Sequence, residues 1–306
     1  MSRVAVIDMG SNSTRLLVAD VAAGHVRELA RETRVTRLAQ GVDSSGRLSD
    51  EAVDRVLGAL VDYKALIDHH GAERVTAVAT SAVRDADNGG DFLATLRERF
   101  GFEAQILSGD EEARLTFLGA TAARPPGGDP TLVLDIGGGS TEFVIGAPGG
   151  NPGFHVSTQA GAVRQTERHV TADPPPREDL HALAEEVSGI IAAAVPEDLR
   201  RSTGAGIAVA GTATSVAAID QELDPYDPER VHGYELQLAA CERVLAELAA
   251  LPEDRRREVK GLHPDRAPTI VAGVTILIEA MRAFGLESME TSEADILHGA
   301  ALSSSS

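Results

Sequence analysis

The 306-residue sequence contains no tryptophan, a single cysteine and few aromatic residues. With Cys241 alone no disulfide can form within the chain, which is typical of proteins from a reducing compartment. Aromatic residues make up 3% of the chain, so a platform on which nucleic-acid bases stack is not expected. Only 28 Lys and Arg stand against 47 Asp and Glu, for a net charge of −19. This charge repels nucleic acid and anionic membrane surfaces.

Long apolar runs are also missing. The amino terminus offers four apolar residues before the charge of Asp8, too few for the core of a signal peptide. The longest weakly polar run, residues 206–219, is short for a membrane span and is interrupted by Thr212, Thr214 and Ser215. We therefore expect a cytoplasmic protein that binds neither nucleic acid nor a membrane.

The most informative feature that is present is a repeat. Residues 3–19 read as an apolar strand ending in Asp8, a Gly/Ser turn and a second apolar strand, and residues 131–145 repeat this pattern around Asp135. Duplication of this kind predicts two related domains that face each other. The Pro- and Gly-rich residues 123–130 are typical of a linker, so we divide the chain into domains 1–124 and 125–306.

Strands and helices alternate around these two hairpins. Ser49 and Gly71 bracket a helix with apolar residues at helical spacing. We further expect strand 75–79 and helix 111–122, a helix from 177 to about 195, and a strand and turn over 206–215. Three more helices are expected over 235–250, 267–284 and 293–302, with a frayed tail at 303–306; the last helix could return to the first domain. This alternation predicts α/β domains with mixed sheets.

Each Gly-rich turn has the composition of a phosphate-binding loop. Glycine lets the backbone approach an anion closely, and consecutive N–H groups form a concave donor site. The Asp that ends each strand suits Mg²⁺ held through water. One such loop alone could be an ordinary hairpin turn, but two copies with Asp at the same offset favour function. The candidate phosphate-binding residues of the loops are Gly10, Ser11, Asn12, Ser13, Gly137, Gly138, Gly139, Ser140 and Thr141. Neither loop matches the G-x-x-x-x-G-K-[ST] pattern, and each leads into a strand.

Four motifs, at residues 8–13, 79–86, 107–114 and 135–142, resemble in order and spacing the exopolyphosphatase and guanosine pentaphosphate phosphohydrolase family. Residues 161–164 and 210–214 match later motifs of that family. The resemblance implies the two-domain actin-like fold of sugar kinases and Hsp70 chaperones, with a cleft between duplicated mixed-sheet domains. It also implies hydrolysis of the terminal phosphoanhydride of inorganic polyphosphate, or of the 5′-γ-phosphate of guanosine pentaphosphate, with Mg²⁺ or Mn²⁺. The chain looks like the short form of the family, which favours short polyphosphates.

The resemblance also assigns roles to individual residues. Glu112 looks like the residue that orients or deprotonates the attacking water, and Glu142 like its partner on the water or the metal. Asp8, Asp135 and Glu142 are the candidate metal ligands, and Arg84 resembles a phosphate ligand of the family. Taken from the residues alone, Glu112 could simply complement a helix dipole. Glu142 could equally face solvent, and Arg84 could be a paired surface arginine.

Several functions remain open at this point. The glutamate pair favours an exopolyphosphatase, with guanosine pentaphosphate hydrolysis as an alternative or second activity in the stringent response. An ATP-dependent kinase of the same fold is another alternative, as is a non-hydrolytic regulator that binds polyphosphate or the alarmone. A regulator has no need of a water-activating base, so the glutamates argue against it. The basic residues 255–266 could guide a polyanion, but we expect at least half of them to form a solvated surface. A homodimer is left open.

Overall fold

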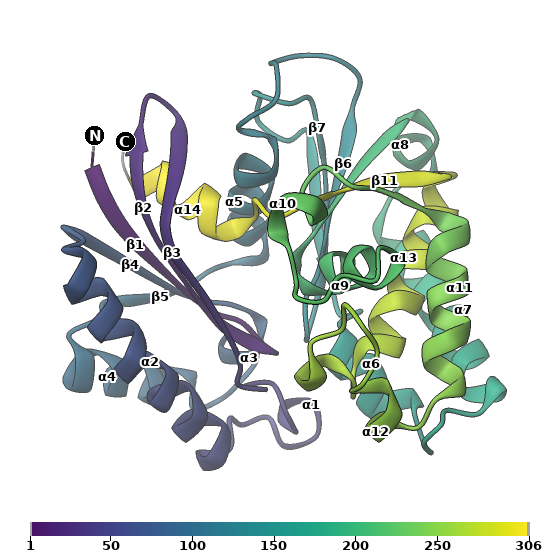
Figure 1. The fold of residues 1–306 in the computed structure, drawn as a ribbon, viewed down its shortest axis with the longest axis horizontal. Helices are drawn as coiled ribbons and strands as arrows, with labels where there is room; N and C mark the ends of the chain where they lie inside the picture. The colour runs from purple at the N-terminus through teal and green to yellow at the C-terminus, as the bar shows by residue number, and fades with distance from the viewer. Residues whose placement is uncertain (1, 305–306) are drawn as a thin grey trace. The chain divides into compact units, whose positions relative to one another are not determined.

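The structure is a computed structural model, and it describes residues 2–304 of the chain. The chain forms two compact units. The first contains the residues up to Arg124 together with those from Asp295 onward, and the second is Pro125–Ala294. Each unit is an α/β structure built on one mixed sheet (Figure 1). Among residues 2–304, no helix has the length and apolar character needed to cross a membrane.

The sheet of the first unit has the strand order β3-β2-β1-β4-β5. Strands β1, β2 and β3 form an antiparallel meander, and β4 and β5 add to β1 in parallel. The strands are β1 (Ser2–Met9), β2 (Ser13–Ala22), β3 (His25–Val35), β4 (Arg74–Ala79) and β5 (Ala104–Ile106). The two central strands are buried on both faces, which explains why their sequence is almost continuously apolar.

Helices cover both faces of this first sheet. One face packs against α2 (Asp50–His70) and α4 (Gly89–Phe100), and the other against α5 (Gly109–Thr121) and α14 (Ile296–Ser304). The caps of α2 are local: the Ser49 hydroxyl accepts from the amide of Ala52, and Gly71 ends the helix in the left-handed region. The short helices α1 (Val42–Ser45) and α3 (Ser81–Arg84) complete the unit.

The sheet of the second unit has the order β10-β11-β9-β6-β7-β8. Strands β6, β7 and β8 are again an antiparallel meander, and β9 and β11 extend it in parallel. The strands are β6 (Thr131–Ile136), β7 (Thr141–Gly146), β8 (Phe154–Thr158), β9 (Ala205–Val209), β10 (Glu235–Gln237) and β11 (Ser288–Ser292). Apart from the added β10, this is the strand order of the first unit, so the repeat in the sequence corresponds to a repeat of the fold.

The core of the second unit lies on one face of its sheet. It is formed by α7 (Arg177–Ala194), α9 (Ala210–Asp220), α11 (Leu238–Ala250) and α13 (Ile270–Phe284) packed against alternate residues of β6, β7 and β8. In Figure 1, α13 is the yellow-green helix beside α7 and α11. The remaining helices are α6 (Ala162–His169), α8 (Glu197–Ser202), α10 (Pro228–Val231), α12 (Glu253–Arg256) and the 3₁₀ turn Pro264–Arg266.

Three sequence predictions were wrong in detail. Residues 210–215 were expected to form a turn, but helix α9 begins directly after β9, with Ala210 in the left-handed region (φ 62°) at the junction. The helix expected over 235–250 begins only at Leu238, since residues 235–237 pair with β11. Ser303 and Ser304 belong to α14, so the expected frayed tail does not begin at Ser303; its last two residues lie outside the described part of the chain.

Candidate functional site

The first candidate loop connects β1 to β2. Its turn closes through a hydrogen bond from the amide of Gly10 to the carbonyl of Ser13, 3.0 Å. The carbonyl of Ser11 accepts from the amide of Ala39, and that of Asn12 accepts from the two residues after β3. The Ser11 hydroxyl lies 2.8 Å from that of Ser81, at the start of α3. The loop is therefore held by its carbonyls and by one hydroxyl.

The second candidate loop, between β6 and β7, is built in the same way. The amide of Gly137 donates to the carbonyl of Ser140, 2.9 Å. The carbonyls of Gly137 and Gly138 accept from backbone amides at the start of α6, and that of Gly139 accepts from Nε of Arg164 at 3.0 Å. In both units the loop carbonyls thus accept hydrogen bonds from the segment that follows the third strand of the meander, which is β3 in the first unit and β8 in the second.

This arrangement leaves the loop amides as donors. Within residues 2–304, the amides of Ser11, Asn12, Gly138 and Gly139 have no acceptor. Successive backbone N–H groups can form a concave site for an anion. In both loops the neighbouring carbonyls already accept hydrogen bonds, so only the N–H groups remain for such a ligand. The Thr141 hydroxyl does not add to it, because it donates to the carbonyl of Ala160. The predicted phosphate contact of Thr141 stays a prediction.

Gly161 shows how tightly the second loop is packed. A Cβ atom added to it would lie 2.3 Å from both the carbonyl oxygen of Gly138 and the carbonyl carbon of Gly139. Real Cβ atoms do not approach backbone so closely, so any side chain here would push the loop away from α6. The motif at residues 161–164 therefore supports the loop in two ways. Gly161 lets the start of α6 lie against the loop backbone, and the amides that follow it donate to the loop carbonyls.

The two aspartates that precede the loops have opposite surroundings. Asp8 lies opposite Arg15 on β2, and its Oδ2 accepts two hydrogen bonds from that guanidinium, at 2.6 and 3.0 Å. Arg15 also donates to Asp295, at the point where the chain returns to the first unit. Burial raises the pKa of Asp8 above its usual range, against the attraction of Arg15. Its Oδ1 atom is buried with no partner among the described residues.

Asp135 lies opposite a second carboxylate, Glu142 on β7. Both residues are buried, with 7% and 1% of their surface exposed. Directly opposed residues of antiparallel strands project to the same face, so the two carboxylates share the sheet face that points away from the core of their unit. The row continues to Ser157 on β8, whose hydroxyl donates to Oε1 of Glu142 at 2.7 Å. No pattern in the sequence singled out Ser157.

The donor set fits a divalent cation better in the second unit than in the first. Mg²⁺ is usually held by one or two carboxylates, with water and substrate phosphate as the other ligands, and Asp135 with Glu142 provides such a pair. At Asp8 the guanidinium of Arg15 already occupies Oδ2 and repels a cation. Residues 2–304 contain no group of three or more His, Cys, Asp or Glu side chains placed to hold a metal. The metal roles of these residues stay predictions.

Glu112 and its neighbour Glu111 do different things at the start of α5. Glu111 forms a capping box with Ser108, and these hydrogen bonds from the Ser108 amide and hydroxyl hold its pKa below the usual range. Glu112 takes no part in this cap. It is buried, and its Oε2 accepts from Arg84 Nη1 at 3.1 Å. Glu111 therefore caps the helix, whereas Glu112 lies in the same first turn, where it can complement the helix dipole, and pairs with Arg84.

Arg84 ends the short helix α3. Its Nη1 atom also donates to the carbonyl of Leu107, 2.9 Å away, which anchors the side chain across the start of α5. The side chain is 24% exposed. The Nε atom of Arg84 lies 4.0 Å from Oδ1 of Asp85. The Nη2 atom keeps its N–H groups for a phosphate oxygen, so the position is compatible with the predicted phosphate contact.

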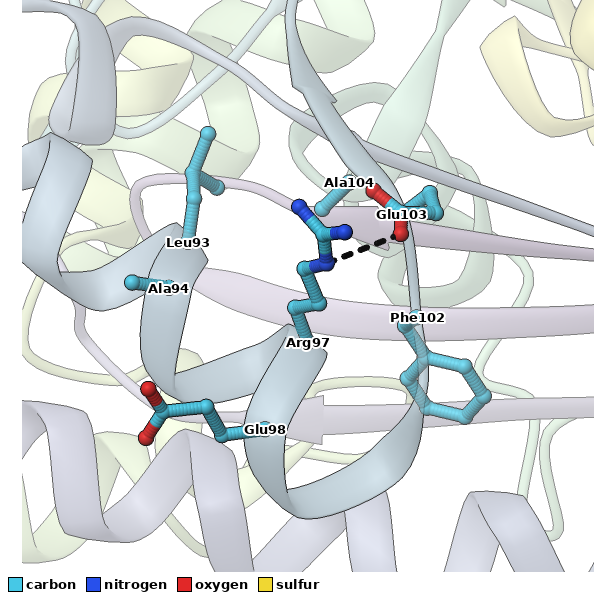
Figure 2. A pocket seen from close by; sticks show the side chains of 7 residues that line it. All are labelled: Leu93, Ala94, Arg97, Glu98, Phe102, Glu103 and Ala104. Carbon is cyan, nitrogen blue, oxygen red and sulfur yellow. Dashed lines mark ion pairs between the residues drawn. The ribbon is translucent and has the colours of Figure 1, made fainter.

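A surface pocket of about 570 Å³ lies elsewhere in the first unit, between α4 and β5. Figure 2 shows that Arg97 and Glu103 face each other across it, joined by an ion pair of 3.1 Å. Its lining contains none of the candidate residues named from the sequence.

The basic stretch at residues 255–266 is not uniformly solvated. Arg255 is largely exposed, whereas Arg256 is 3% exposed and donates to Asp173 and to the carbonyls of Leu251 and Ala267. Arg266 packs against Gly211 so closely that a Cβ atom there would lie 1.6 Å from its Nη1. At least these two arginines therefore organise the second unit.

The duplicated sheets and loops define the class: an α/β protein of two related units, each with a glycine-rich hairpin loop whose carbonyls are hydrogen-bonded within the unit. A model of the Ppx/GppA phosphatase family matches residues 17–305. Exopolyphosphatase 2 of Mycobacterium tuberculosis is 38% identical over 99% of this chain and 98% of its own length. Exopolyphosphatase 1 of Mycobacterium bovis is 32% identical over 94% of this chain and 84% of its own length. The chain belongs to the Ppx/GppA phosphatase family.

Solved structures agree with this assignment. The Ppx/GppA family member of Aquifex aeolicus superposes with a TM-score of 0.83 at 29% identity, covering 99% of this chain and 97% of that one. An exopolyphosphatase from Cytophaga hutchinsonii superposes with a TM-score of 0.90 at 25% identity, covering 99% and 98%. The predicted family is confirmed, and with it a fold of two related units, each built on a mixed sheet. Its kinship with actin, sugar kinases and Hsp70 chaperones stays a prediction. The expected cleft between the halves stays a prediction.

Proposed function

We propose that this protein is an exopolyphosphatase, which releases orthophosphate by hydrolysing the terminal phosphoanhydride of inorganic polyphosphate. The observation that carries the proposal is full-length similarity: at 38% identity the chain aligns over 99% of its residues with a protein named exopolyphosphatase 2. Cleaving a phosphoanhydride requires that the phosphoryl group be positioned, its charge neutralised and a water activated. The candidate residues supply a group for each requirement.

Phosphate oxygens are proposed to bind the loop amides and Arg84. The carbonyls of both loops are already occupied, so binding an anion there costs no existing loop hydrogen bond. A fixed set of donors also needs little reorganisation when charge develops on the phosphoryl oxygens. This explains how an acidic chain can bind a polyanion: the donors are local and directional.

The proposed acid–base residues are Glu112 and Glu142. Each is buried and accepts a hydrogen bond, from Arg84 for Glu112 and from Ser157 for Glu142. A carboxylate fixed in this way can orient a water and accept its proton. Asp135 and Glu142 are the residues that would hold Mg²⁺ or Mn²⁺. When bound, the cation would neutralise charge on the phosphate oxygens.

Guanosine pentaphosphate hydrolysis is proposed as a second activity, supported by the family to which the chain belongs. Its 5′ end presents the same terminal phosphoanhydride, so the same groups would cleave it. We also propose a cytoplasmic location, since the one cysteine of the chain is buried and reduced. A homodimer stays a prediction, which the mass in solution would test.

The test is release of orthophosphate, measured side by side from polyphosphates of several defined lengths and from guanosine pentaphosphate, with and without Mg²⁺. We expect metal-dependent release from polyphosphate. Formation of ATP when ADP is added would instead indicate a kinase. Tight binding of polyphosphate without turnover across several divalent metals would indicate a regulator and contradict the proposal.

A further inference from the structure

We infer that Glu186 positions the loop between β6 and β7, because it holds helix α6, which donates hydrogen bonds to the carbonyls of that loop. The inference deepens the proposed function and rests on it, since the position of the loop matters for catalysis only if its amides bind phosphate. The link between helix and loop is direct. The amides of the first two residues of α6 donate to the carbonyls of Gly137 and Gly138, at 2.9 and 2.8 Å. Glu186 is thus a positioning residue and not a catalytic one.

Glu186 lies on α7 and accepts hydrogen bonds from three side chains of α6. Nε2 of Gln165 lies 3.3 Å from its Oε1, and Arg168 donates to the same oxygen. Nε2 of His169 lies 2.7 Å from its Oε2 and is the donor, because an ionised carboxylate only accepts. Burial tends to raise the pKa of Glu186, but these three donors outweigh it and hold that pKa below its usual range. One side chain therefore binds α6 at three positions.

Gln165 shows how far this contact determines the local structure. Its side chain is fully buried, and its Oε1 has no partner among the described residues. A buried acceptor without a partner costs free energy. Turning the amide over would not remove that cost, since it would place Oε1 against the carboxylate of Glu186. Gln165 is therefore oriented by Glu186, although its other end stays unsatisfied.

Helix α7 is a fixed base for these hydrogen bonds. Leu183 and Val187 flank Glu186 in the sequence, and both are fully buried in the core of the second unit. Two turns earlier, Asp179 accepts from the amide and the hydroxyl of Thr171, just beyond the end of α6, at 2.9 and 2.8 Å. The end of α6 is thus tied to α7 by two carboxylates, while its start is tied to the loop.

The experiment compares Glu186→Gln with Glu185→Gln, the same change at the adjacent residue of α7. Glu185 is exposed and pairs with His181 on its own helix, at 3.3 Å. Amide hydrogen exchange is measured without substrate, at Gly137 and along α6. We expect exchange at these amides to rise about tenfold in Glu186→Gln, because the loss of hydrogen bonds to a charged group favours local opening. Exchange in Glu185→Gln should match the wild type.

Unchanged exchange at these amides in Glu186→Gln would overturn the inference. An equal rise at the amides of the central strand β6 would overturn it too, since the effect would then be on the whole unit. If Glu186→Gln does not fold, Asp179→Ala takes its place. This change releases the tie to Thr171 and should raise exchange in α6, and a wild-type rate there would contradict the inference.

Release of orthophosphate from polyphosphate connects the loop to the reaction. In Glu186→Gln, kcat/KM should fall about tenfold because displaced donors position the substrate less well, and in Glu185→Gln it should not change. If exchange in α6 rises while kcat/KM stays at the wild-type value, the inference is wrong and the proposed function stands. A wild-type protein that releases no phosphate would contradict the proposed function, and with it this role of Glu186.

Discussion

Arg15 and Glu142 occupy equivalent positions in two copies of the same hairpin, and they carry opposite charges. Each lies directly opposite the aspartate that precedes its loop, Asp8 or Asp135. In the first unit the result is an ion pair that neutralises the aspartate. In the second it is a pair of carboxylates on one face of the sheet. The two units thus share the loop but differ at the strand position opposite the aspartate. Arg15 at this position forms an ion pair with Asp8, whereas Glu142 gives a candidate metal and water site with Asp135.

This difference predicts which aspartate matters for the metal. The apparent Mg²⁺ constant, obtained from the rate of phosphate release against Mg²⁺ concentration, should rise at least tenfold in Asp135→Asn, which removes one of two carboxylate donors. Asp8→Asn should leave that constant within about twofold of wild type, although it leaves the buried Arg15 with one fewer partner. Equal rises in both variants would contradict the assignment.

The adjacent pair Glu111 and Glu112 offers a matched test of catalysis. Glu112→Gln should lower kcat by about 10² to 10⁴-fold, the usual contribution of a general base. Glu111→Gln should stay within about threefold of wild type, because glutamine also completes a capping box. Both variants should unfold near the wild-type temperature. A Glu112→Gln protein with wild-type kcat would remove Glu112 from the mechanism.

Gly161 should be required for the second loop. Gly161→Ala places a Cβ atom 2.3 Å from the carbonyl oxygen of Gly138, so the loop must move and its amides with it. We expect KM for polyphosphate to rise and kcat to fall, with a combined loss in kcat/KM of at least about tenfold. Gly189→Ala on α7 is the control, since nothing lies within 4 Å of its added Cβ. Wild-type kinetics of Gly161→Ala would mean that the loop tolerates displacement.

Two glycines let α5 and α14 touch backbone to backbone. A Cβ atom on Gly119 would lie 1.9 Å from the carbonyl oxygen of Asp295, and one on Gly299 1.8 Å from that of Leu115. Gly119→Ala and Gly299→Ala should each lower the free energy of unfolding by about 1–3 kcal/mol, as overpacking does, measured by urea denaturation. Gly58→Ala on α2, where nothing lies within 4 Å, should instead stabilise the protein by about 0.5–1 kcal/mol. No loss in the first two variants would show that the helices can separate at little cost.

Asp295 should make stability depend on pH. Burial tends to raise the pKa of Asp295, but Arg15 and Arg31 outweigh it and hold that pKa below the usual range. A carboxyl with a lowered folded pKa contributes stability above its unfolded pKa and loses it as pH falls through the folded value. Asp295→Asn should therefore cost about 3 kcal/mol at pH 7. The gap to wild type should close as the pH is lowered below about 4, measured by urea denaturation at each pH. A gap that is constant with pH would exclude this ion-pair origin.

Most of the fold could be predicted from local patterns in the sequence. The hairpins at Asp8 and Asp135 and the capped helix α2 follow from patterns within one element, and each was predicted. Strand β3 was missed because it is mostly charged and half exposed, with no apolar run. The strand at residues 235–237 was predicted as helix because three residues acquire strand structure only by pairing with β11.

The contacts within the candidate site could not be predicted from local sequence patterns either. The sequence named Glu112 and Arg84 separately, but their contact joins residues 28 apart in the chain. Ser157 had no local signal, because its contact with Glu142 depends on the register of β8 against β7. Arg15, the partner of Asp8, also pairs with Asp295, 280 residues further along the chain. Contacts of this range follow from packing and not from any motif.

The central claim is that water attacks the terminal phosphorus of polyphosphate. Turnover of a polyphosphate of defined length in water enriched in ¹⁸O, followed by mass spectrometry, tests it directly. Attack on the terminal phosphorus places one ¹⁸O atom in each orthophosphate released and leaves the shortened chain unlabelled. Label in the shortened chain, or orthophosphate released without ¹⁸O, would contradict the account.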